Sequence, residues 1–559
     1  IGAATPDTIN TTVSSLTATN TTSGGIFIHQ TSGLTIASGG VQTQGGNGPI
    51  SVVVEDGNFT VDGAVSANGS GNVLLEAEGS VTPTSDLQVN AAVGSGSGSI
   101  TLEGYRNVTF TAPGDVTVSG SGGTIYVNAE NGGISQAAGT QAQTDGSNII
   151  FDAATDIVLG VVDARVTSDQ GGTLTSQSSW GNVALTADTG TITNAQSRVA
   201  TATNVYANNL RLESSGGIGV LGSGSNNPVV TEVITVAAVT DSAAAGDVNL
   251  LEDTGITVGT VAPFTANVVA EDASTSTTST TSLSGLTTTA GSAGSIVLVT
   301  TDGTITVSTP VAAGGSGNVL IEAQGTNSDV LDNAAIGSVS GDIEVSAARN
   351  ATFAGTGNVT VTNAGGTIDV VAVSGAISQL ATLKAQTDGS NISFTAGTNI
   401  VLGIVDARVT SDQGGTLTSQ SSWGNVALTA TGGTITNAQT RVASSTNVYA
   451  NNLRLESSGG LGVLGSGSNN PVVTEVITVA GKTDSTAAGD INLLEDTSVT
   501  VGAVAAISVK AVAVDNTTSA ATTASLSGLA TGAGSTGSIV LVTTDGTITV
   551  STPVAAGGS

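Results

Sequence analysis

The stretch from Val162 to Ala187, VDARVTSDQGGTLTSQSSWGNVALTA, recurs unchanged from Val405 to Ala430. The two copies lie 243 residues apart, and other residues scattered through the chain obey the same shift. These are the pairs Arg106/Arg349, Arg165/Arg408, Arg198/Arg441, Arg211/Arg454, Trp180/Trp423 and Tyr206/Tyr449. Self-similarity at one long period is the signature of a repeat architecture, in which each unit contacts mainly its neighbours. We therefore expect an array rather than a set of independent domains.

A shorter period lies inside the long one. Segments of the pattern apolar-x-apolar-x-small start near Val73, Ile100, Ile125, Ile149, Val183, Leu210, Val248, Ile296 and Val319. Most spacings are close to 24 residues, with three longer gaps. Alternation at period two indicates strands with one buried face, and a coil of about 24 residues accommodates three short strands and three turns. The sequence thus predicts an all-β fold, a right-handed parallel β-helix (β-solenoid) with coils of about 24 residues grouped in 243-residue repeats.

The repeats set the expected boundaries. Residues 1–70 match the later part of a module in diverged form, 71–313 form the first full module, 314–556 form the second, and 557–559 begin another. The chain lacks methionine altogether, so we expect it to be part of a longer polypeptide. Two Thr/Ser-rich segments, 273–294 and 516–537, hold few apolar residues and are predicted to be exposed loops that are candidates for O-glycosylation.

Composition excludes several classes of function. The chain has 11 Lys and Arg against 42 Asp and Glu, for a net charge of −31. Recognition of nucleic acid phosphates or of an anionic membrane surface needs clustered cations, so neither partner is expected. No run of about 18 apolar residues occurs, so this segment is not expected to span a membrane. Aromatic residues make up only 2%, and the core must therefore be aliphatic.

Several phrases resemble a known family. Asn208 to Val261 reads NNLRLESSGGIGVLGSGSNNPVVTEVITVAAVTDSAAAGDVNLLEDTGITVGTV, and it is accompanied by GSGNVLIEAQG (315–325) and GSIVLVTTDGTITV (294–307). These resemble the giant filamentous-haemagglutinin-like bacterial surface proteins. The resemblance implies a β-helical shaft that is exported and displayed as an adhesin, with an extracellular or cell-surface location. It carries over no functional residue, because such shafts have no fixed catalytic motif.

One recurring cluster could contact a glycan. Asp163 and Arg165 lie two residues apart, on one face of an expected strand, with Asp169 and Trp180 nearby. Carboxylates and a guanidinium bind sugar hydroxyls, and an indole stacks on a sugar ring. The same set recurs as Asp406, Arg408, Asp412 and Trp423. The alternative, which we favour, is a structural ion pair beside a loop that packs one tryptophan onto the shaft.

No other pattern points to catalysis or to a cofactor. The single histidine, His29, has no repeated partner set for a triad or a metal site. The acidity leaves Ca²⁺ open, but a hard cation needs several converging oxygens and no dense Asp run occurs.

The leading hypothesis is a structural or adhesive shaft that displays repeated loops and is not an enzyme. Its partners would be further copies of itself or host and matrix glycans. One alternative is a subunit of a self-assembling extracellular filament or sheath. The other is a β-helical protein that binds or cleaves polysaccharide.

Overall fold

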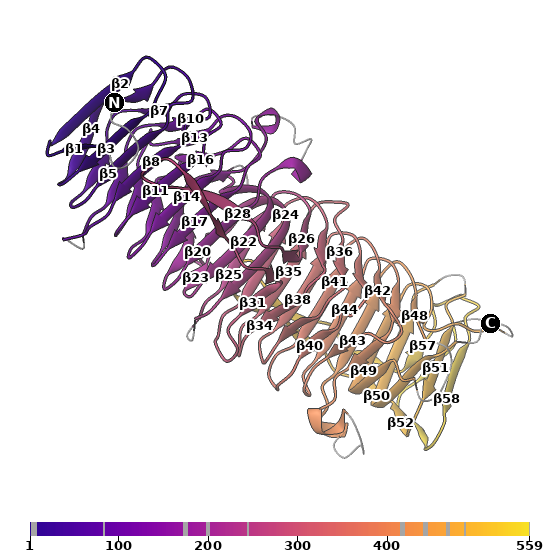
Figure 1. The fold of residues 1–559 in the computed structure, drawn as a ribbon. Coiled ribbons are helices and arrows are strands. Elements are labelled where there is room, and N and C mark those ends of the chain that lie inside the picture. The colour runs from indigo at the N-terminus through magenta and orange to yellow at the C-terminus, as the bar shows by residue number, and fades with distance from the viewer. Residues whose placement is uncertain are drawn as a thin grey trace. The chain divides into compact units, whose positions relative to one another are not determined.

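The computed structural model describes residues 1, 8–81, 84–170, 177–196, 202–242, 245–413, 420–439, 445–465, 470–485 and 488–557. They form an all-β parallel β-solenoid of about 20 turns, about 25 residues apart, with 2% helix (Figure 1). This confirms the predicted fold class. Two compact units are present: residues 1–221, 225–253 and 259–285 form the first, and 222–224, 254–258 and 286–559 form the second. No helix in the described ranges is long and apolar enough to cross a bilayer.

Three parallel ladders build the first unit. The first contains β1 (Ile9–Thr11), β3 (Ile26–Gln30), β5 (Ile50–Val54), β8 (Val73–Ala77), β11 (Ile100–Gly104), β14 (Ile125–Ala129), β17 (Ile149–Ala153), β20 (Val183–Ala187) and parts of β22 (Val205–Ser214) and β24 (Val229–Thr240). The second contains β2 (Ser15–Asn20), β4 (Leu34–Thr43), β6 (Phe59–Val61), β9 (Leu87–Val89), β12 (Val108–Phe110), β15 (Ile134–Gln136), β18 (Ile157–Leu159), β21 (Thr191–Asn194), β23 (Gly217–Ile218) and β25 (Val248–Glu252). The third joins β4 to β7 (Val65–Ala67), β10 (Val93–Ser95), β13 (Val116–Val118), β16 (Gln141–Gln143), β19 (Val161–Asp163) and β22.

The second unit repeats this plan. Its first ladder contains β32 (Ile296–Thr300), β35 (Val319–Ala323), β38 (Ile343–Ala347), β41 (Ile368–Ala372), β44 (Ile392–Ala396), β47 (Val426–Ala430), β49 (Val448–Ser457) and β50 (Val472–Thr483). The second contains β26 (Ile256–Val258), β33 (Ile305–Val307), β36 (Val330–Asp332), β39 (Ala351–Phe353), β42 (Ile377–Gln379), β45 (Ile400–Leu402) and β48 (Ile435–Asn437). The third contains β31 (Leu286–Thr288), β34 (Val311–Ala313), β37 (Ile336–Ser338), β40 (Val359–Val361), β43 (Lys384–Gln386) and β46 (Ile404–Asp406), and joins β49. Further strands near the end of the chain are β51 (Ile491–Glu495), β52 (Val499–Val501), β57 (Leu529–Ala530), β58 (Ile539–Thr543), β59 (Ile548–Val550) and β60 (Val554–Ala555).

The core lies inside the turns and is aliphatic. Parallel pairing places Val73 beside Ile100 and Leu75 beside Leu102, and all four side chains are fully buried. Burial of each such side chain contributes about 1.5–3 kcal/mol, which a single turn could not achieve alone because its neighbours supply the cover. The few aromatic residues join the same stacks, since most of the phenylalanines, Phe110 and Phe151 among them, are buried.

The long gaps between predicted strands hold extra structure. Two short 3₁₀ helices, η1 (Thr167–Asp169) and η2 (Gln177–Ser179), follow β19, and η3 (Thr410–Asp412) and η4 (Gln420–Ser422) follow β46. The longest gap in the first unit is filled by a hairpin with two short strands in each arm. The first hairpin, residues 259–285, contains β27 (Thr260–Val261), β28 (Thr265–Val269), β29 (Thr275–Ser279) and β30 (Leu283–Ser284).

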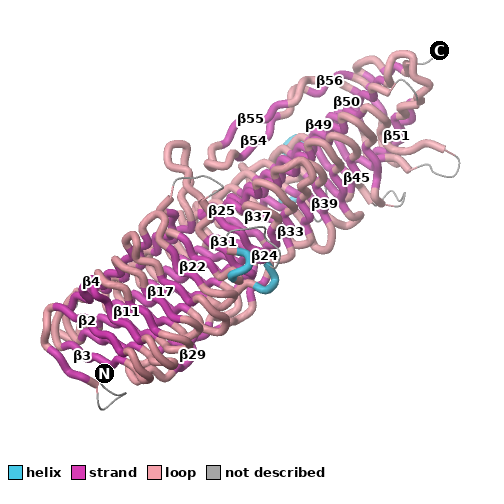
Figure 2. Tube along the Cα trace, turned by 90° about the horizontal axis from the view of Figure 1, so that it is seen from above, coloured by secondary structure: helices cyan, strands magenta, loops and turns pink. Residues whose placement is uncertain are grey.

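An equivalent hairpin occupies the second unit. The second hairpin, residues 502–528, contains β53 (Ala503–Val504), β54 (Ser508–Val512), β55 (Thr518–Thr522) and β56 (Leu526–Ser527), and Figure 2 shows β54 and β55 lying against the solenoid from outside. Parts of the segments predicted as loops, 273–294 and 516–537, are therefore strands. They form strands despite their low apolar content because Thr is a good strand former and each segment pairs with an apolar partner strand.

Candidate functional site

The structure gathers the predicted cluster around Arg165. Asp163 is the last residue of β19, and its carboxylate accepts two hydrogen bonds from the Arg165 guanidinium, Nη2–Oδ2 at 2.7 Å and Nε–Oδ1 at 2.9 Å. Arg165 Nη1 also donates to the backbone oxygen of Asp169, at 3.2 Å. Trp180 Nε1 donates to Asp169 Oδ2 at 2.8 Å. All four residues thus belong to one hydrogen-bonded network.

The indole of Trp180 lies inside this network rather than on the surface. It is only 3% exposed, and it packs edge-on against Tyr206, with ring centroids 6.4 Å apart. A sugar ring needs an open aromatic face for stacking, and Trp180 does not offer one. Its structural part is to fix Asp169, which is itself fully buried.

Tyr206 completes the cluster. The Arg165 guanidinium carbon lies 3.6 Å from the centroid of the Tyr206 ring, a cation–π contact. Burial alone would lower the pKa of Arg165, but the hydrogen bonds and charge of Asp163 raise it above its ordinary value. Arg165 is therefore a fixed, fully charged and internally compensated group. Tyr206 recurs as Tyr449 at the repeat shift, and this was the only sequence signal for its role.

The second copy has the same geometry. Arg408 Nη2 lies 2.7 Å from Asp406 Oδ2, Trp423 Nε1 lies 2.8 Å from Asp412 Oδ2, and Arg408 stands 3.7 Å from the Tyr449 centroid. The Asp, Arg and Trp residues of the network lie in the segment that is identical in the two copies, so the same local sequence gives the same network in each unit.

A polar groove of about 510 Å³ lies beside the first cluster. Its lining comprises Gln141, Gln143, Val161, Asp163, Arg165, Gln170, Gln196, Ala202, Thr203 and Tyr206. Three of the glutamines are held in place through their amide nitrogens, by Asp163, by the Thr144 oxygen and by the Gly160 oxygen. We name this set the glutamine groove. Sequence reasoning missed its glutamines, because isolated polar residues on outward strand positions (Gln141, Gln143) or in turns (Gln170, Gln196) carry no distinctive pattern.

The corresponding residues of the second unit differ at three positions. Lys384 replaces Gln141, Ile404 replaces Val161 and Ser445 replaces Ala202, while the other lining residues are identical. The second copy therefore carries one additional positive charge at this place.

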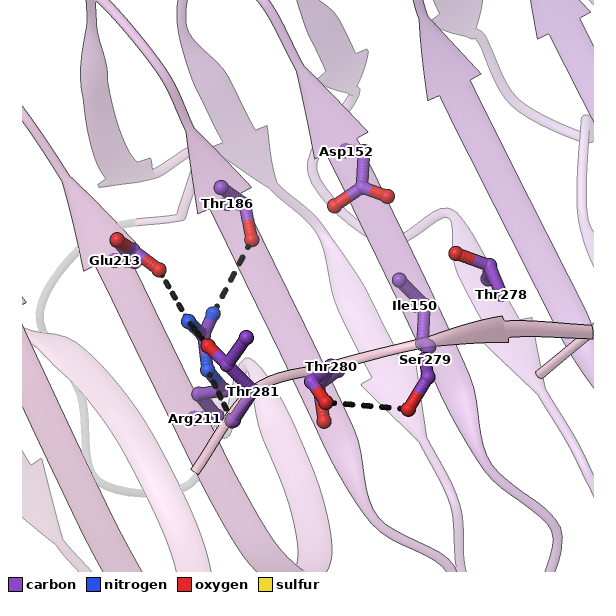
Figure 3. Close-up of a pocket in the computed structure, with 9 residues that line it drawn as sticks. All are labelled: Ile150, Asp152, Thr186, Arg211, Glu213, Thr278, Ser279, Thr280 and Thr281. Atoms are coloured by element: carbon purple, nitrogen blue, oxygen red, sulfur yellow. Dashed lines mark hydrogen bonds and ion pairs between the residues drawn. The ribbon is translucent and has the colours of Figure 1, made fainter. Parts of the chain in front are cut away.

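A second, smaller pocket of about 200 Å³ lies under the first hairpin. Figure 3 shows β29 and the residues after it passing over the solenoid strands β17, β20 and β22, which carry Asp152, Thr186 and Glu213. Arg211 donates from Nε to the Thr281 oxygen at 3.1 Å and forms an ion pair with Glu213. Burial raises the pKa of Asp152 in this pocket. The Arg211 guanidinium thus bonds to Thr281 of the hairpin and to Glu213 of the solenoid, so this site connects the hairpin to the solenoid.

Metal ligation finds no support in the part of the chain that the structure describes, where no group of three or more His, Asp or Glu residues is arranged to hold an ion. His29 lies in β3 beside Asn10 and Val53.

No protein-family model matches the chain, and neither the curated proteins nor the solved structures include a match to it.

Proposed function

We propose that this chain is a structural shaft of an extracellular or cell-surface fibre, and that the glutamine groove is its contact with neutral glycans. The observation that carries the proposal is that one solenoid plan presents the same Arg–Asp–Trp–Tyr network twice, once in each unit. A parallel solenoid suits a spacer, since turns add without changing the cross-section. The sequence phrases that resemble filamentous-haemagglutinin-like adhesins agree with this reading.

The chemistry of the glutamine groove fits a ligand rich in hydroxyl groups. Asp163 neutralises the charge of Arg165 at the base of the groove, so this ion pair does not favour a charged ligand. The amide oxygens of Gln143 and Gln196 remain as acceptors for hydroxyl donors, since their nitrogens are already engaged. Weak single contacts of this kind gain avidity when the site recurs along one chain.

We propose binding without cleavage. A glycosidase uses one carboxyl group as an acid and a second as a base or nucleophile, in positions free to react. Asp163 instead accepts three hydrogen bonds from Arg165, two from its guanidinium and one from its backbone N–H.

A glycan microarray probed with the full chain tests the proposal. We expect retention of neutral glycans, and loss of at least about tenfold in affinity when Gln143→Leu and Gln386→Leu are combined, because each removes a groove acceptor. Gln88→Leu, an outward position on β9 away from the groove, is the matched control and should bind normally. The groove assignment would be refuted if the wild-type chain bound none of the glycans, or if the double variant bound as tightly as the Gln88→Leu control.

A further inference from the structure

The inner edge of the first hairpin is bonded to the solenoid through its backbone. The N–H groups of Asn267 and Val269 in β28 donate to the hydroxyls of Thr124 and Thr101, at 2.8 and 2.9 Å. The Thr265 oxygen accepts a bond from Asn148 Nδ2 at 2.9 Å. Side chains from successive turns therefore take the place of a neighbouring strand along this edge.

The second hairpin is attached in the same manner. In β54, Lys510 N–H donates to Thr367 Oγ1 at 2.8 Å and Val512 N–H donates to Glu344 Oε2 at 2.6 Å. The Ser508 oxygen accepts from Asn391 Nδ2 at 2.8 Å. Both hairpins thus follow the direction in which the turns stack, and both have one satisfied edge.

The opposite edge of each hairpin is open. β29 pairs only with β28, in a sheet of two strands. Alternate residues of an antiparallel strand direct their backbone N–H and C=O groups toward the partner strand. Ala270 N–H bonds to Ser274 O and Thr280 N–H bonds to Phe264 O, so Ser274 and Thr280 face the β28 side. The backbone groups of Thr275, Thr277 and Ser279 therefore point away from β28. Within the described structure nothing pairs with this row, and all three residues are exposed. β55 presents the same edge at Thr518, Ala520 and Thr522.

Nothing in these edge strands discourages pairing. Natural edge strands are usually protected by charged residues, proline or a bulge, and β29 (TSTTS) and β55 (TSAAT) contain none of these. Threonine is moreover a favourable strand residue and pairs well with threonine across strands.

We propose that the open edge of β29, and likewise that of β55, is a self-association surface that pairs antiparallel with the same hairpin of a second copy of this chain. A two-fold axis between the Thr277 residues of the two copies would place Thr277 opposite its own counterpart and Thr275 opposite Ser279 of the other copy. The three outward N–H groups of each strand would then meet three carbonyl groups of the other strand. Two copies would then lie side by side, because the hairpins follow the stacking direction.

Charge favours a second copy in this antiparallel orientation. The strand itself is uncharged, and the acidic residues of the hairpin, Glu271 and Asp272, lie at its tip. Antiparallel pairing moves the two tips to opposite ends of the contact, whereas parallel pairing would place them together and like charges would repel. No acidic side chain therefore lies within the paired strands. Repulsion between the acidic groups elsewhere on the two chains acts over longer distances and is screened at physiological salt.

Sedimentation of the full chain over a range of concentrations tests the proposal. Wild-type protein should associate reversibly. The double variant Thr277→Pro, Ala520→Pro removes an outward N–H from each edge without removing a bond inside either hairpin, and it should weaken association about tenfold or more. The single variant Thr277→Ala is the matched control. It keeps the backbone N–H, already has alanine as its counterpart in β55, and should associate like wild type.

A charge exchange adds an independent readout. Thr277→Lys with Ala520→Lys, and Thr277→Glu with Ala520→Glu, should each be monomeric alone, because identical charges face each other across the two-fold axis. An equimolar mixture of the two should associate. A monomeric wild type, association of the proline variant at wild-type strength, or failure of the mixture to associate while each variant keeps its β-sheet spectrum would each overturn the proposal. The outcome is independent of glycan binding.

Discussion

Asp332 is an acidic residue in an aliphatic core. It occupies the place that Val89 holds in the first repeat, it is fully buried, and neither carboxyl oxygen has a hydrogen-bond partner. Burial raises its pKa to about 8.

This pKa makes stability depend on pH. The folded state keeps a proton that the unfolded state releases near pH 4, so stability should fall as pH rises from about 4 to about 8 and change little from this group outside that window. We expect Asp332→Val to remove the part of this dependence that Asp332 contributes and to stabilise the protein near pH 7 by roughly 3 kcal/mol or more, since a core valine replaces a protonated acid. Denaturant unfolding at pH 5 and pH 8 measures this. An equal pH dependence in both proteins would contradict it.

Ala273 adopts a backbone conformation that suits glycine or asparagine. Its φ is +62°, at the tip of the first hairpin, while the same place in the second hairpin holds Asn516 with φ +64°. A left-handed alanine costs about 1 kcal/mol, so Ala273→Gly should stabilise the hairpin by about 0.5–1 kcal/mol. Hydrogen exchange of the β28 amides would show slower opening. Asn516→Ala is the reciprocal test and should accelerate opening of the second hairpin, where Asn516 also accepts a bond from Asn318.

Individual residues show where sequence reasoning ends. The repeat shift singled out Asp163, Arg165, Asp169 and Trp180 as a set that recurs in the second copy, but the spacing did not show that the Trp180 indole donates to Asp169. Whether a polar side chain points into a groove or supports a neighbour depends on packing between turns, which one-dimensional spacing does not contain.

At the scale of the element, the two hairpins pack on different solenoid residues. Under β54 the solenoid presents Glu344 and Asp369 side by side in register, whereas the same two positions under β28 hold Thr101 and Tyr126. Burial raises the pKa of Glu344 to about 7, with Asp369 and Glu322 adding to the rise while the Val512 N–H opposes it. Burial likewise raises the pKa of Asp369 to about 6.

The second hairpin should therefore loosen as pH increases. Both acids are protonated in the docked and undocked states below about pH 4, and they resist ionisation when docked, so docking weakens as pH rises toward about 7. Protection factors of the Lys510 and Val512 amides should fall over this range, and Glu344→Gln should reduce the fall. An unchanged pH profile in Glu344→Gln would show that Glu344 does not control docking. Thr101→Glu would transfer part of the effect to the first hairpin.

Elements with apolar alternation were predictable, and the hairpins were not. Every predicted strand start from Val73 to Val319 lies at or next to an observed strand start or, for Leu210, within the longer β22. The hairpin strands show little of that alternation because they contain few apolar residues. The inner edge of the first hairpin is bonded to side chains such as Thr124 and Asn148. Those partners lie more than a hundred residues away, beyond any local pattern.

At the scale of the whole molecule, the 243-residue period should be removable as one piece. Joining Val162 directly to Asp406 deletes one complete period and restores the sequence VDAR at the junction. Since a solenoid turn needs only the turn before it and the turn after it, we expect a soluble protein with the same β-sheet spectrum per residue and cooperative unfolding. A matched deletion that ends twelve residues earlier shifts the phase by about half a turn and should aggregate. If the two deletion proteins were equally soluble and unfolded with equal cooperativity, the 243-residue period would not be a structural unit.

The first hairpin also has a mechanical consequence. Pulling the ends of the chain along the stacking direction loads the hydrogen bonds of the outermost turn first, so a bare stack would unravel turn by turn at low force. The hairpin is fastened at Asn72, Thr101, Thr124, Asn148 and Arg211, so those turns cannot separate until it has been torn off. Under tension the chain should lengthen in jumps, with the stretch from β8 to β22 yielding late and as a single block.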